Sequence, residues 1–140
     1  MRRTILYHIT TLCAWIFLLG LAVPANVLGE TELEIGYGAI CKYVENHEVV
    51  WESTSFPSDV KKVYCFTKIL GAKEPTAVRH VWYYGNTELA SVELAVKTKS
   101  WRTYSSKLIM PDQTGPWHVD VVDNKGSIIE TYRFDIFKKQ

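Results

Sequence analysis

The chain has 140 residues, with 16 lysines and arginines against 15 aspartates and glutamates, so its net charge is +1. A nearly neutral chain has no strong field to attract a phosphate backbone, which excludes nucleic acid as the expected partner. A chain of this length folds around one hydrophobic core.

The first residues have the layout of a secretory signal peptide. Arg2 and Arg3 form a short basic region, and an apolar run follows it. Small residues then fit cleavage after Ala25, or as late as Gly29. Polar residues dilute the early part, so the uninterrupted apolar core is shorter than the roughly 20 residues of a membrane-spanning helix. We therefore expect a signal peptide over residues 1–25 and an extracytoplasmic location, periplasmic or secreted; the alternative is a segment retained as a membrane anchor.

Residues 26–140 alternate between apolar and polar side chains, with turn residues between the alternating segments. A period of two indicates strands, and this spacing of turns is typical of a β-sandwich or barrel. Residues 45–58 are the least regular part, where we expect a turn of helix or a plain loop. The predicted fold class is all-β: a single small antiparallel β-sandwich domain, immunoglobulin-like, of about seven strands. The expected strands lie near residues 39–44, 60–70, 77–84, 88–96, 101–110, 117–123 and 128–137.

The alternation also assigns side chains to faces of the sheets. In the sixth expected strand, Trp117, Val119 and Val121 share one side, which is the candidate core. His118 and Asp120 share the other side.

Two cysteines, Cys41 and Cys65, follow the expected cleavage site. In an oxidising compartment, a pair without metal-type spacing is usually a disulfide, which would stabilise the fold by about 3.5 kcal/mol on the chain-entropy model. Two free buried thiols are the alternative, because a bridge needs Cα atoms within about 7 Å of each other. Cys65 followed by Trp82 also begins the immunoglobulin signature, but no cysteine follows near residues 117–132 to complete that bridge.

Side chains suited to metal binding or catalysis are few. A small periplasmic enzyme or metal-binding protein could use His80, His118 and Asp120. The simpler interpretation is a solvent-facing polar pair on one strand and a hydrogen-bonded, partly buried histidine on another. The sequence has no nucleophile elbow, zinc-protease motif or glycine-rich phosphate loop. We therefore expect no enzyme activity, no catalytic residue, no metal and no cofactor.

A cluster of aromatic and basic residues lies on the fifth expected strand and faces another such pair on the third. Rings and planar bases together are what surfaces that bind sugars and anions use, through stacking and forked hydrogen bonds. The alternative is that the rings fill the core and that the arginine stem covers one of them. The candidate surface for a ligand or partner consists of Trp101, Arg102, Tyr104 and Lys107 together with Arg79 and Tyr83.

Four blocks follow one another along the expected strands. They are VYCFTK from residue 63, HVWYY from residue 80, SWRTYSSK from residue 100 and TGPWHVDVVD from residue 114. In this order they resemble the bacterial domain of unknown function 2914 (DUF2914) family, and Cys41 and Val44 fit the opening of its pattern. The resemblance covers nearly all of residues 26–140. It implies a small β-sandwich-type module, found behind signal peptides or attached to membrane segments, with no established activity, so it assigns no catalytic or binding residue.

These features predict an exported, non-catalytic β-sandwich module for binding or assembly in the cell envelope. Its expected partner is a protein or glycan of the envelope, and the membrane is a partner only if the N-terminal segment is retained. A small enzyme or metal-binding protein is one alternative. A structural subunit of an envelope or membrane complex, recognised by sheet-edge pairing, is the other.

Overall fold

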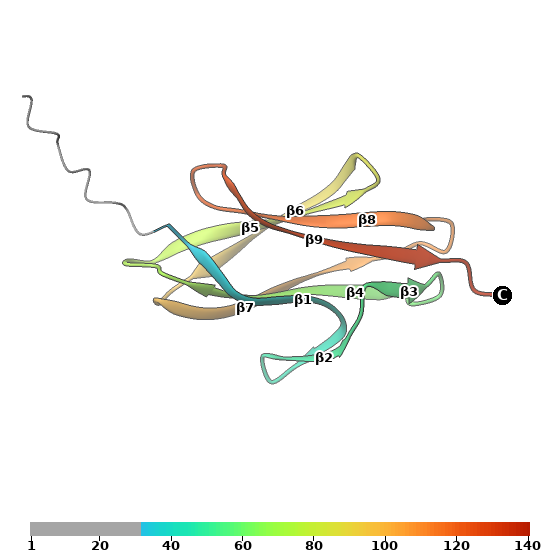
Figure 1. Cartoon of the computed structure of the whole chain (residues 1–140), viewed down its shortest axis with the longest axis horizontal. Helices are drawn as coiled ribbons and strands as arrows, with labels where there is room; N and C mark the ends of the chain where they lie inside the picture. The colour runs from blue at the N-terminus through green and yellow to red at the C-terminus, as the bar shows by residue number, and fades with distance from the viewer. Residues whose placement is uncertain (1–31) are drawn as a thin grey trace, which may run out of the picture.

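The computed structural model describes residues 32–140, in which nine strands form two sheets that pack face to face (Figure 1). The all-β sandwich predicted from the sequence is therefore confirmed. None of the described residues forms a helix that could cross a membrane. The expected signal peptide over residues 1–25, with its later cleavage position at Gly29, lies outside the described residues. The strands are β1 (Glu34–Glu45), β2 (Glu48–Glu52), β3 (Ser55–Pro57), β4 (Lys62–Leu70), β5 (Thr76–Tyr84), β6 (Thr87–Val96), β7 (Ser100–Leu108), β8 (Gly115–Val122) and β9 (Ile128–Phe137).

One sheet has four strands in the order β2-β1-β4-β7, and the other has five in the order β3-β9-β8-β5-β6. Neighbouring strands are antiparallel, except that β3 runs parallel to β9. Without the short strands β2 and β3, seven strands remain, divided as β1-β4-β7 and β9-β8-β5-β6. Three strands thus face four, which agrees with the predicted number of strands.

Residues 45–58, expected as a turn of helix or a loop, contain β2 and β3 instead. Asn46 and His47 form the two-residue turn between β1 and β2, with φ angles of 49° and 58°. Both angles are positive, as a type I′ hairpin turn requires, and these two side chains tolerate such angles better than most. The expectation is wrong here because the usual signal for this turn includes a glycine, which this hairpin lacks.

The core between the sheets consists of two apolar clusters, and Tyr132 packs against both. In the larger cluster, the ring centroids of Trp82 and Trp117 lie 6.2 Å and 5.9 Å from that of Phe134. Trp117 and Val119 are buried there, as the alternation predicts. Large rings supply much of the buried area of this small sandwich.

The β1–β2 hairpin folds back over the outer face of its own sheet. β1 pairs with β4 only as far as Cys41 and then pairs with β2 alone. Glu48, next to the hairpin turn, reaches Arg102 on β7 at the far edge of the sheet. Figure 1 shows the hairpin below the layer formed by β1, β4 and β7. This cover explains why Ala39, Cys41 and Phe66 are buried although they point away from the other sheet.

Candidate functional site

A cluster of polar side chains lies in the core between the two sheets. His80 on β5 is fully buried, and its Nδ1 and Nε2 atoms lie 2.8 Å from Ser105 Oγ and 3.1 Å from Thr67 Oγ1. The indole N–H of Trp82 also donates to Ser105 Oγ, at 3.0 Å. Thr67 and Ser105 belong to the four-stranded sheet, whereas His80 and Trp82 belong to the five-stranded sheet. These four residues, the buried polar cluster, therefore join the two sheets.

Burial away from water lowers the pKa of His80 to about 4, so its imidazole is neutral at pH 7. A neutral imidazole has one N–H donor and one bare nitrogen. One arrangement of hydrogens gives every atom of the cluster a partner. In it, Ser105 accepts the Trp82 N–H and donates its own hydrogen to His80 Nδ1, while Nε2–H donates to Thr67 Oγ1.

The distance between Ser105 and His80 is that of a nucleophile and its base, but their position differs from that of a catalytic pair. Ser105 is 6% exposed and His80 is 0% exposed. A substrate would have to separate the two sheets to reach them. The geometry instead supports a structural role, in which the hydrogen bonds determine which residues of the facing sheets meet.

The three residues considered for a metal or catalytic site are not all brought together. His118 and Asp120 share the outer face of the five-stranded sheet, as the alternation predicts, but His80 points into the core from β5. The ring of His118 stacks on that of Tyr83, with centroids 4.5 Å apart. Asp120 Oδ1 accepts a hydrogen bond from Thr131 Oγ1 at 2.7 Å. Within residues 32–140, no group of three or more metal-binding side chains forms.

The structure corrects the expected disulfide, because Cys41 and Cys65 are both free and buried. In the β1–β4 register, Ile40 lies opposite Cys65, and Cys41 lies opposite Tyr64. Paired residues project to the same face and neighbours along a strand to opposite faces, so the two thiols point to opposite sides of the sheet. Burial raises the pKa of both thiols, that of Cys41 to about 11, which keeps them protonated and unreactive at pH 7.

The six residues of the candidate surface divide among three places. Arg79 and Tyr83 lie on the outer face of the five-stranded sheet. Arg102 and Tyr104 lie on the outer face of the four-stranded sheet. Trp101 and Lys107 lie on the inner side of the edge strand β7. The two outer faces lie on opposite sides of the sandwich, so no single surface passes through all six.

Two of the six do meet, in a groove at the tip of the β1–β2 hairpin. This hairpin-tip groove has a volume of about 380 Å³. Lys68 on β4 and Arg102 on β7 lie directly opposite each other there. Next to them, the rings of His47 and Tyr104 meet edge to face with centroids 6.5 Å apart. The groove is lined by His47, Lys68, Ser100, Trp101 and Arg102.

The electrostatics of the hairpin-tip groove are dominated by its two cations. Arg102 Nη1 donates to Glu48 Oε1 at 2.5 Å, and this pair is exposed to solvent. Among the described residues, Lys68 has no hydrogen-bond or ion-pair partner. Arg102 forms its ion pair through one nitrogen of a guanidinium with five N–H donors. The groove therefore offers an ammonium and guanidinium donors to an acidic group.

No motif in the sequence indicated His47 and Lys68 as groove residues. His47 falls in the segment expected to be irregular, and its place depends on the hairpin folding back over the sheet. Lys68 meets Arg102 only through the register of β4 and β7. Alternation within a strand fixes which face a residue occupies but not its neighbour on the next strand. The sequence did contain one signal for this pair: Lys68 and Arg102 each occupy an outward position of their strand.

The match to a known family covers the second half of the sandwich. Residues 75–136 match the model of a family described as a protein of unknown function (DUF2914). The resemblance is thereby confirmed from β5 almost to the end of β9, whereas the sequence blocks before residue 75 lie outside the match. Trp101 and Arg102 fall within the match, and His47 and Lys68 do not. No curated protein matches the chain in sequence.

Proposed function

We propose that this DUF2914-type chain is an exported, non-catalytic module that binds an acidic partner in the cell envelope through the hairpin-tip groove. The observation that carries the proposal is the convergence of Lys68, Trp101 and Arg102, from two neighbouring strands, at one accessible groove. The partner is a protein or a glycan that carries carboxylate, sulfate or phosphate groups.

The chemistry of the groove supports an acidic partner. A guanidinium binds a carboxylate or phosphate through forked hydrogen bonds, and a lysine adds a mobile point charge. Lys97 Nζ lies 5.7 Å from the centroid of the Trp101 ring, which adds a further cation at the same end of β7. In the unbound state, Glu48 accepts one hydrogen bond from the Arg102 guanidinium. An incoming acidic group would either displace Glu48 or bind the remaining N–H donors of Arg102.

The burial of the most reactive side chains supports a non-catalytic role. His80, Ser105, Cys41 and Cys65 are all buried. Burial also lowers the pKa of the histidine and raises that of the thiols, so neither type of group is activated at pH 7. Export is supported by the N-terminal sequence, with its basic start and apolar run.

Co-purification from the cell envelope tests the proposal. The tagged chain and a Lys68→Glu/Arg102→Glu variant are expressed in their own host, and the proteins that co-purify from the envelope fraction are compared. We expect the double variant to lose a partner that the unchanged chain retains, because charge reversal repels an acidic group. Retention should also weaken as salt is raised, since exposed charges are screened.

Arg79→Glu is the matched control. It changes the same kind of charge on the outer face of the other sheet, so it should leave the partner bound. A partner lost equally with Arg79→Glu and with the double variant would place the interaction elsewhere and refute the groove as the binding site.

A further inference from the structure

A second hollow lies near the root of the β1–β2 hairpin, where the chain leaves β2 toward β3. This Trp51 hollow has a volume of about 340 Å³, within the range of roughly 300–1,000 Å³ that small-molecule sites occupy. Its apolar lining comes from Trp51, Phe56, Pro57 and Val60. Its polar lining comes from Lys42, Glu52, Ser53 and Asp59.

Trp51 is held in a conformation that folding alone does not favour. Its φ angle is 58°, in the left-handed region that a bulky side chain rarely adopts. Trp51 is 74% exposed, so burial of its ring does little to offset the free-energy cost of this backbone conformation. The ring contacts Tyr43, with centroids 6.2 Å apart, and is otherwise open to solvent. Backbone strain held at an exposed position is the kind of feature that clusters at binding sites.

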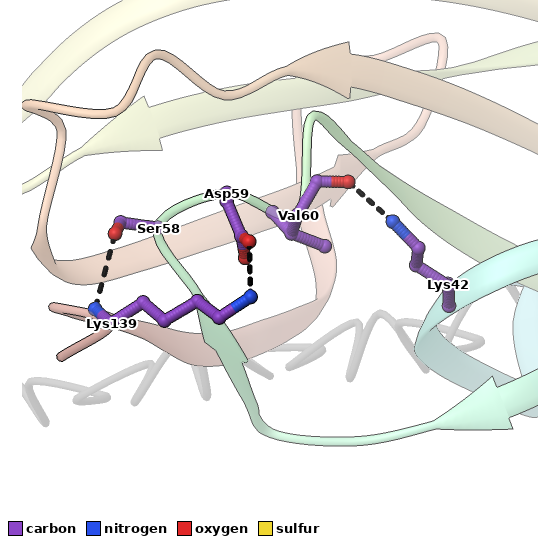
Figure 2. Close-up of polar contacts among 5 residues, drawn as sticks. All are labelled: Lys42, Ser58, Asp59, Val60 and Lys139. Atoms are coloured by element: carbon purple, nitrogen blue, oxygen red, sulfur yellow. Dashed lines mark hydrogen bonds and ion pairs between the residues drawn. The ribbon is translucent and has the colours of Figure 1, made fainter.

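The polar wall of the hollow is held in place by the end of the chain. Figure 2 shows Lys42 donating to the carbonyl of Val60. It also shows the backbone N–H of Lys139 bonded to Ser58 Oγ at 3.2 Å and its ammonium bonded to Asp59 Oδ2 at 2.6 Å. The two Lys139 bonds tie residues 58 and 59 to the C-terminal segment, and the Lys42 bond ties residue 60 to β1, so the groups at the wall are positioned before a ligand arrives.

The charges at this wall balance, and several hydrogen-bonding positions stay open. Lys42, Glu52 and Asp59 are the charged residues of the lining, and Asp59 is ion-paired with Lys139, so the remaining charges of Lys42 and Glu52 balance. One of the three N–H groups of the Lys42 ammonium is used in the bond to the loop. Glu52 Oε2 accepts from the hydroxyl of Tyr37 at 2.8 Å, which leaves Oε1 free to accept. A ligand with both donors and acceptors, and without a charge, suits such a wall.

We infer that the Trp51 hollow binds a neutral sugar ring of a glycan. A pyranose has an apolar C–H face, which stacks on the exposed indole, and hydroxyl groups at its edge, which donate to the carboxylates and accept from Lys42. An anion would meet Glu52 and Asp59, and a cation would meet Lys42. A purely apolar ligand would cover these charged groups and leave them without partners. This site is independent of the hairpin-tip groove, from which it differs in residues and in charge.

Nuclear magnetic resonance of the ¹⁵N-labelled full chain tests the inference. Cellobiose, lactose and N,N′-diacetylchitobiose are each titrated to about 10 mM, ten times the dissociation constant of a millimolar site. We expect at least one of them to shift the indole N–H signal of Trp51 in a saturable way and to leave that of the buried Trp82 in place. Glucuronate should bind more weakly than glucose, its neutral counterpart. No shift of the Trp51 signal with any of the three disaccharides, or tighter binding of glucuronate, overturns the inference.

Trp51→Gly separates binding from stability. Glycine adopts the positive φ without strain, so this variant should keep or raise the melting temperature while it abolishes the sugar-induced shifts in neighbouring residues such as Tyr43. Ile128→Ala is the matched control, because it removes another exposed apolar side chain and should leave sugar binding unchanged. A Trp51→Gly chain that still binds the disaccharide, or that unfolds as if a core residue had been removed, contradicts the assignment.

Discussion

The two faces of the four-stranded sheet are both covered, but by different means. On the inner face, Thr67 and Ser105 are buried and bonded to side chains of the opposite sheet. On the outer face, the cover is a hairpin of the same sheet, whose Glu48 forms an ion pair with Arg102. The side chains of that pair are 45% and 65% exposed.

This difference separates stability from binding. A buried polar atom that loses its partner is costly because water cannot replace the bond, whereas an exposed ion pair contributes little because water and salt compete with it. The inner face should therefore control the free energy of unfolding. The outer face carries the cations Lys68 and Arg102, and its hairpin carries the exposed ring of Trp51. These side chains should control recognition. Each of the following changes acts on one face and not on the other.

Ser105→Ala should have the largest effect. It leaves His80 Nδ1 and the Trp82 N–H without their shared partner, and each unsatisfied buried group costs about 1–3 kcal/mol, so we expect a loss of about 3–4 kcal/mol in the free energy of unfolding. Urea denaturation measures it. Ser106→Ala, the next residue on β7, changes an exposed hydroxyl on the outer face and should stay within about 0.5 kcal/mol of the unchanged chain. Similar losses for the two variants would contradict the structural role of the buried polar cluster.

The pH dependence of stability should show the burial of His80. In the unfolded chain the His80 imidazole has a pKa near 6.5, whereas in the folded chain its pKa is about 4, so it is protonated only at a lower pH. The stability due to neutral His80 is therefore fully present above pH 6.5 and is lost as the pH falls toward 4. The difference between a pKa of 6.5 in the unfolded chain and about 4 in the folded chain corresponds to about 3 kcal/mol.

Comparison with His80→Gln isolates this contribution from that of the carboxylates. The stability advantage of the unchanged chain over the variant should shrink by about 3 kcal/mol between pH 7 and pH 4. Parallel curves for the two proteins over this range would mean that His80 titrates normally in the folded state and is not sealed in the core.

The sequence predicted well what depends on neighbours along the chain. Alternation placed most of the strands and the inward side of Trp117, Val119 and Val121, because a period of two is a local property of a strand. It did not predict the β1–β2 hairpin, whose turn has asparagine and histidine in place of glycine. The composition of the groove and the directions of the two thiols depend on pairing between strands that are distant in sequence. The register of these strands places Lys68 opposite Arg102 and makes Cys41 and Cys65 point apart. A local sequence pattern does not specify that register.

The ion pair on the outer face should contribute little to stability. A double-mutant cycle with Arg102→Ala and Glu48→Ala should give a coupling energy of about 0.5 kcal/mol or less, which falls further at high salt, because both side chains are solvated. Urea denaturation of the four proteins at low and high salt measures it. A coupling above 2 kcal/mol would show that the pair holds the hairpin in place, and the guanidinium would then be less free for a ligand.

The two thiols report on the two faces separately. Because Cys41 and Cys65 are free, addition of a reductant should leave the free energy of unfolding unchanged, where breaking a disulfide of this loop length would cost about 3.5 kcal/mol. Alkylation of the unfolded chain without reductant should label both. In the folded chain Cys41 should react before Cys65, because local opening of the hairpin exposes the first, whereas the second is sealed until the sheets separate. Equal labelling rates, equal also to the rate of global unfolding, would mean that the hairpin and the core open as one unit, and the division of labour between the faces would not hold.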